Sequence, residues 1–147
     1  MELFDSHCHL DDKAFSRDLE DVVRRASQAG VNRMTTIGVD RNTSFRAVQL
    51  AESIPGVCAT VGFHPHDARF CTEAALRELV RLAGRPAVRA WGEIGLDFNR
   101  MHSPKTDQEK WLARQLEISE QLALPVVFHE RDSGGRLIEI LRSDFSS

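Results

Sequence analysis

Short apolar segments alternate along the chain with longer amphipathic segments, and the alternation repeats five times. Between the apolar segments, apolar residues recur at helical spacing, which predicts helices that each bury one stripe. Alternating strands and helices of this kind form parallel sheets with right-handed crossovers. The pattern therefore predicts an α/β fold of five βα units in a single domain, residues 1–147. The predicted strands are residues 2–4, 34–39, 57–63, 88–94 and 125–129.

Polar residues at the helix ends predict where the helices begin. Ser16 and Thr72 are expected to cap the first and third helices. Thr106 and Glu109 have the spacing of a capping box at the start of the fourth helix. On the second helix the apolar stripe includes Phe45, which is therefore expected to be buried.

The length of the chain bears on the kind of parallel sheet. Five βα units fit a doubly wound sheet or part of a (β/α)8 barrel. A complete barrel takes ~250 residues, so the 147 residues of this chain hold about five of eight units. We expect an incomplete TIM barrel whose first and fifth strands have unpaired edges, which favour self-association of the chain.

Composition narrows the functional classes. The chain is 41% hydrophobic and 28% charged with a net charge of −3, so binding of DNA would need local basic residues or bound cations. The three cysteines, Cys8, Cys58 and Cys71, form no CxxC pair, which favours free thiols in a reducing compartment such as the cytoplasm. No apolar run approaches ~18 residues and the first residues are acidic, so we expect neither a membrane span nor a secretion signal.

A histidine pair follows the first predicted strand in the segment DSHCHL. Residues i and i+2 of an extended segment face the same way, so His7 and His9 can bind one cation. The alternative is a pair of histidines held by ordinary hydrogen bonds. Asp5 lies on the same face and is expected to orient a ligand.

Two further candidate ligands lie at the ends of later strands. Glu93 stands in the apolar segment WGEIGLD, where an unpaired carboxylate would be costly, so it requires a cation or an arginine such as Arg89. His129 ends the fifth strand. Active sites of parallel barrels form at the carboxyl ends of the strands. The sequence therefore predicts a metal site, with Glu93 also catalytic, made of His7, His9, Glu93 and His129.

Other polar residues on the same rim are candidates for binding substrate. His64 and His66 follow the third strand in GFHPH and are expected to donate hydrogen bonds to an anionic substrate; a second metal pair or a loop cap are the alternatives. Asp97 is expected to position water or a ligand, and Arg131 to hold a phosphate with two hydrogen bonds. Each of these two residues fits a solvated ion pair equally well. His102 is expected to be exposed.

Four segments, DSHCHLD, GFHPH, GEIGLDF and PVVFHERD, resemble in order and spacing the motifs of TatD-type deoxyribonucleases, which are amidohydrolase-like TIM-barrel hydrolases. The resemblance spans essentially the whole chain. It implies hydrolysis of DNA that depends on divalent metal, including 3'-to-5' exonuclease activity. It further implies that His7 and His9 are the ligands of the first strand, that Glu93 can bridge two metals, and that His129 is the ligand of the fifth strand.

The resemblance also implies ligands beyond those of this sequence. Full members continue with a histidine on a sixth strand and an aspartate on an eighth, which is the expected general base. We expect one or two divalent ions, with Mg2+, Zn2+ and Mn2+ as candidates, and DNA or an oligonucleotide as substrate. The alternatives are a metal-dependent deacylase or amidohydrolase, and a non-catalytic fragment that pairs with another polypeptide. The chain as given is expected to have little hydrolase activity.

Overall fold

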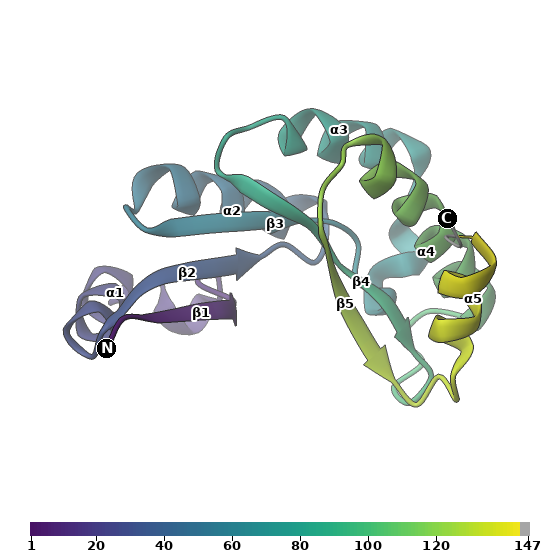
Figure 1. The fold of residues 1–147 in the computed structure, drawn as a ribbon, viewed down its shortest axis with the longest axis horizontal. Coiled ribbons are helices and arrows are strands. Elements are labelled where there is room, and N and C mark those ends of the chain that lie inside the picture. The colour runs from purple at the N-terminus through teal and green to yellow at the C-terminus, as the bar shows by residue number, and fades with distance from the viewer. Residues whose placement is uncertain (145–147) are drawn as a thin grey trace.

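The strands form one open parallel sheet. A computed structural model, which describes residues 1–144, places five strands side by side in the order in which they follow along the chain (Figure 1). All four neighbouring pairs are parallel. The prediction of five parallel strands is confirmed. The strands are β1 (Leu3–Cys8), β2 (Val31–Ile37), β3 (Val57–Val61), β4 (Val88–Asp97) and β5 (Val126–Arg131).

A helix follows every strand, and strands that are consecutive in the sequence are neighbours in the sheet. This is the strand order of a barrel wall. With right-handed connections and strands in chain order, the helices cover the same face of the sheet. Figure 1 shows α2 and α3 along one side, with α4 and α5 beside β4 and β5. No helix within residues 1–144 has both the length and the apolar character needed to cross a membrane. The helices are α1 (Leu19–Gln28), α2 (Arg41–Ser53), α3 (Glu73–Ala83), α4 (Lys105–Gln121) and α5 (Arg136–Asp144), with the 3-10 turns η1 (Lys13–Phe15) and η2 (Pro65–Phe70).

Four strands are longer than predicted, and β3 ends two residues early, at Val61. β1 continues to Cys8, so His7 lies within the strand rather than beyond it, and β4 continues to Asp97, so Glu93 lies in the middle of the strand rather than at its end. The predictions stopped early because polar residues and glycines interrupt the apolar pattern there. Pairing overrides that local signal, since Gly95 and Asp97 are in register with His129 and Arg131 of β5.

The first helix begins later than predicted. Ser16 does not cap α1; instead it ends η1, where its hydroxyl donates a hydrogen bond to the carbonyl of Lys13. The residue before α1 is Asp18, whose side chain makes no capping hydrogen bond. A 3-10 turn therefore uses the capping residue that the sequence assigned to the helix.

The predicted cap of α3 is confirmed, whereas the predicted cap of α4 is wrong. Thr72 caps α3 as predicted, because its hydroxyl accepts a hydrogen bond from the amide of Ala75 at 3.1 Å. The capping box of Thr106 and Glu109 is wrong. α4 begins directly after Pro104, without a side-chain cap, so Thr106 lies inside the first turn.

The core lies between the central strands and the helices. Trp91, Ile94 and Leu96 of β4 have no exposed surface. α2 packs through the small residues Ala47 and Val48, whereas Phe45 is 55% exposed, so its predicted burial is wrong. At the edge strand β1, Leu3 and Phe4 are exposed. The fold therefore buries its centre and leaves an apolar edge open within the described sheet.

All three cysteines are free thiols, as predicted. Cys71 is buried, and burial raises the pKa of its thiol to about 12. Cys8 donates a hydrogen bond to the carbonyl of Thr35 at 3.3 Å. Cys58 lies 3.3 Å from the Thr35 hydroxyl.

Candidate metal centre

Curvature of the sheet brings His7 and Glu93 together. In the sheet order two strands separate β1 from β4, and neighbouring strands lie ~4.8 Å apart. Nevertheless His7 Nε2 lies 3.5 Å from Glu93 Oε2. Both strands also have a register shift that spans the residue concerned, one between Asp5 and Cys8 and one between Trp91 and Ile94. Such irregularities bend a strand and redirect its side chains.

Glycines beside Glu93 allow β5 to pack closely against β4. A Cβ atom on Gly92 would lie 2.3 Å from the carbonyl oxygen of Val127, and one on Gly95 would lie 1.9 Å from that of His129. Both glycines have positive φ angles, +116° and +149°. Only glycine fits these positions. The close packing places His129 next to Glu93.

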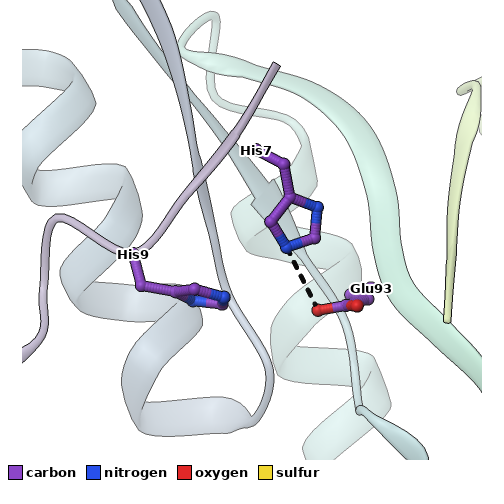
Figure 2. Close-up of side chains that lie close together, drawn as sticks. All are labelled: His7, His9 and Glu93. Carbon is purple, nitrogen blue, oxygen red and sulfur yellow. Dashed lines mark ion pairs between the residues drawn. The ribbon is translucent and has the colours of Figure 1, made fainter. Parts of the chain in front are cut away.

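Three predicted ligands form the first cluster. Figure 2 shows the ring of His7 directed at Glu93, with the ring of His9 extending toward the same space. Donor atoms of His7, His9 and Glu93 all lie within 4.8 Å of one another. Asp5 acts on the backbone, because its carboxylate accepts a hydrogen bond from the amide of His7 at 3.1 Å. The arrangement provides two imidazoles and a carboxylate around one space of cation size.

The second oxygen of Glu93 faces the opposite side. His129 Nδ1 lies 3.3 Å from Glu93 Oε1. The Glu93 side chain is 11% exposed, and within residues 1–144 its charged partners are histidines. The alternative of a Glu93–arginine ion pair, with Arg89 or another arginine, is therefore wrong for the described chain. Glu93 therefore presents one oxygen to His7 and the other to His129.

His64 is a buried, neutral hydrogen-bond donor. Its Nδ1 accepts a hydrogen bond from the backbone amide of His66 at 3.1 Å, so the ring proton lies on Nε2. Burial, together with the rings of His129 and His66, lowers the pKa of His64 to about 3. A donor atom of His64 lies within 4.8 Å of those of Glu93 and His129. His64 therefore adds an uncharged N–H group to this side of the site.

Asp97 joins His66 to His129. Its Oδ2 lies 2.7 Å from His66 Nε2 and 3.1 Å from His129 Nε2. Its Oδ1 accepts hydrogen bonds from the amides of Asn99 at 3.1 Å and Arg100 at 2.7 Å. Burial alone would raise the pKa of Asp97, but the Arg100 amide and the two imidazoles hold it well below its ordinary value. The carboxylate is 1% exposed and charged.

Two candidates lie outside this hydrogen-bond network. The Arg131 side chain is exposed and makes no ion pair or hydrogen bond with residues 1–144; the carbonyl of Arg131 accepts a hydrogen bond from Phe98. His102 is exposed as predicted, with its ring centroid 4.7 Å from that of His66. The structure therefore brings together His7, His9, His64, His66, Glu93, Asp97 and His129, but not Arg131.

Two glutamines of α4 support the site and were missed by the sequence analysis. Gln115 accepts a hydrogen bond from the amide of Phe63 at 2.7 Å and donates one to its carbonyl at 3.0 Å. Gln108 binds the amide and carbonyl of Asp97 in the same way, at 2.8 and 3.0 Å. Both glutamines are 1% exposed. A signal existed, since they lie seven residues apart in the same stripe as the apolar residue Trp111.

Comparison with known proteins agrees with the fold and with the family that the sequence motifs resemble. Residues 4–146 match the family model described as TatD related DNase. The chain is 35% identical over 142 residues to the uncharacterized metal-dependent hydrolase YabD of Bacillus subtilis, covering 97% of the chain and 56% of YabD. It is 40% identical over 141 residues to the 3'-5' ssDNA/RNA exonuclease TatD of Musicola paradisiaca, covering 95% of the chain and 53% of that relative.

Solved structures give the same result. The YJJV TatD homologue of Escherichia coli K12 superposes with a TM-score of 0.87 at 32% identity, over 97% of the chain and 56% of the homologue. An uncharacterized amidohydrolase from Saccharomyces cerevisiae gives a TM-score of 0.88 at 25% identity, over 97% of the chain and 51% of that structure. The chain spans about half the length of the curated relatives it matches. It belongs to the TatD related DNase family.

Proposed function

We propose that this chain supplies part of the active site of a nuclease that depends on divalent metal, with His7, His9, Glu93 and His129 as metal ligands. The observation that carries the proposal is the position of Glu93. Its two carboxylate oxygens face His7 on one side and His129 on the other, at 3.5 and 3.3 Å. A nearly buried carboxylate between imidazoles, with no arginine beside it in the described chain, suits one or two cations.

The donor set limits which cations suit the site. The three imidazoles favour Zn2+ or a similar transition metal, while the carboxylate of Glu93 also suits Mg2+ or Mn2+. When bound, such a cation lowers the pKa of a water molecule and stabilises charge on a phosphate. In the proposed reaction Glu93 holds the cations in place, and Asp5 fixes the backbone of β1 at His7.

The proposed substrate is single-stranded DNA or an oligonucleotide. Relatives of this chain are named 3'-5' ssDNA/RNA exonuclease. Because the chain has a net charge of −3, bound cations would offset its repulsion of a polyanion. His64 supports recognition of phosphate through its Nε2–H group. We include His66 and Arg131 as further substrate-binding residues, with Arg131 reaching phosphate from the exposed end of β5.

We also propose that residues 1–147 are the N-terminal portion of a TatD-like barrel. Support comes from the relatives, of which the chain covers about half, and from the edge positions of β1 and β5 in the described sheet. Strands that extend the sheet at these edges would cover Leu3 and Phe4. The free thiols support a reducing compartment such as the cytoplasm.

The test is a nuclease assay of the complete barrel protein to which we propose this chain belongs. The protein is treated with chelator, given Mg2+, Mn2+ or Zn2+, and offered a 3'-labelled single-stranded oligonucleotide. We expect cleavage only with added metal, and loss of cleavage in Glu93→Gln, which keeps the shape and removes the charge. Glu117→Gln on α4, exposed in the structure, is the matched control. Cleavage by Glu93→Gln at the unaltered rate would contradict the proposal.

A second candidate function is hydrolysis of an ester or C–N bond, which the acidic net charge favours over hydrolysis of a polyanion. The same metal-loaded protein should be offered an aminoacyl ester beside the oligonucleotide. Faster turnover of the ester would assign the chain to this second function.

A further inference from the structure

We propose that Asp97 is a positioning residue of the metal centre, which holds His129 with a proton on Nε2 so that Nδ1 is the atom offered to a cation. The proposal rests on the proposed metal site and specifies how one ligand reaches it. It also changes the role of Asp97 from a residue that binds water or substrate to one that acts through His129.

The direction of the hydrogen bonds fixes the position of the proton. A carboxylate can only accept hydrogen bonds, so both imidazole nitrogens that face Asp97 Oδ2 must donate. His66 and His129 therefore carry protons on Nε2. His129 Nδ1 is then left facing Glu93 Oε1 at 3.3 Å. In a neutral ring these two atoms are both acceptors, and a cation bound by both would relieve their repulsion.

The carboxylate of Asp97 has no capacity left for a substrate. Four groups bind its two oxygens: the amides of Asn99 and Arg100 and the imidazoles of His66 and His129. A carboxylate offers roughly four acceptor positions. All of them are used, and the side chain is 1% exposed.

The backbone of Asp97 is fixed as well. Gln108 accepts a hydrogen bond from its amide at 2.8 Å and donates one to its carbonyl at 3.0 Å. Gln108 also donates to the carbonyl of Ser103 at 2.8 Å, which ties the loop after β4 to the same side chain. With both backbone and carboxylate held, the orientation of the His129 ring follows from the position of Asp97.

The first experiment determines directly which ring nitrogen of His129 carries the proton. Long-range 1H–15N spectra of the histidine-labelled wild-type chain, without metal and with Cd2+, report which nitrogen of each ring is protonated. We expect His129 to keep its proton on Nε2 in both states, and Cd2+ to shift only Nδ1. A wild-type His129 with its proton on Nδ1 alone, or metal-shifted Nε2 signals for both His66 and His129, would overturn the proposal.

The second experiment uses Asp97→Asn. Asparagine keeps an acceptor for the loop amides, but its amide group can donate to His129 Nε2 and drive the proton to Nδ1. We expect that change of tautomer, together with Zn2+ affinity weaker by ~10–100-fold in a chelator competition. Asp21→Asn on α1, exposed in the structure, is the control. Retention of both the Nε2 proton and wild-type affinity in Asp97→Asn would refute the role of Asp97.

The experiments distinguish a failure of the proposed function from a failure of the proposed role of Asp97. If wild type binds no cation, the proposed function fails, while the proton position of His129 still decides the role of Asp97. Glu93→Gln should lose metal affinity yet keep the Nε2 proton of His129, because Asp97 is untouched. Loss of that proton in Glu93→Gln would show that Glu93, and not Asp97, sets the tautomer.

Discussion

Replacing Gln115 by methionine is expected to destabilise the fold strongly although the residue lies in no proposed ligand set. Gln115 makes the two hydrogen bonds to the amide and carbonyl of Phe63 described above, at 2.7 and 3.0 Å, from a position that is 1% exposed. Methionine has similar length and fills the same space, so the change removes hydrogen bonds without opening a large cavity. Each buried group left unsatisfied costs about 1–3 kcal/mol. We therefore expect a loss of about 2–6 kcal/mol in the free energy of unfolding.

The assay is urea unfolding followed by fluorescence of Trp91 and Trp111, which are both buried. The midpoint should fall while the slope m stays unchanged, which indicates lost stability rather than a changed unfolded state. Gln121→Met at the exposed end of α4 is the control, with an expected change below ~0.5 kcal/mol. A loss for Gln115→Met as small as that of the control would refute the reasoning that the Phe63 backbone depends on this side chain.

Three further predictions concern other parts of the chain. Gly95→Ala should prevent the close packing of β5, because its Cβ would lie 1.9 Å from the His129 carbonyl; thermal unfolding at the wild-type temperature would contradict this. Burial raises the pKa of Cys71 from an ordinary 9.0 to about 12, so below pH 9 its thiolate should be about 1000-fold rarer than that of a free thiol. Iodoacetamide, which reacts with the thiolate, should therefore label Cys71 only after unfolding. Phe4→Lys places a charge on the exposed edge strand β1 and should reduce self-association measured by light scattering. A wild-type chain that is already monomeric would contradict the prediction.

The sequence predicted the fold and the gathering of the candidate ligands for one physical reason. Carboxyl ends of parallel strands meet at one edge, so histidines and a glutamate at the ends of separate strands had to come near one another. His7 and Glu93 show which part of the site this reasoning predicts and which part it does not. It placed them on one rim, but the 3.5 Å approach of their side chains depends on sheet curvature and on two register shifts, which local patterns do not encode.

The supporting residues could not be predicted in the same way. Gln108 and Gln115 act on backbone groups of strands that are distant in the sequence, so their partners appear only once α4 is packed against the sheet. Asp97 was predicted to contact water or a ligand, whereas its carboxylate is bound by the loop after β4, by His66 of η2 and by His129 of β5. The predicted burial of Phe45 was wrong for a different reason. Its spacing fitted a buried stripe, but α2 packs against the sheet through smaller residues.

The central claim is that Glu93 lies between metal-binding histidines of β1 and β5. Anomalous X-ray diffraction from crystals grown with Zn2+ or Mn2+, recorded on both sides of the metal absorption edge, tests it most directly. The account predicts anomalous density beside a Glu93 oxygen, contacted either by His7 and His9 or by His129 Nδ1. Metal density only elsewhere in a crystal saturated with the ion, with Glu93 unligated, would contradict it.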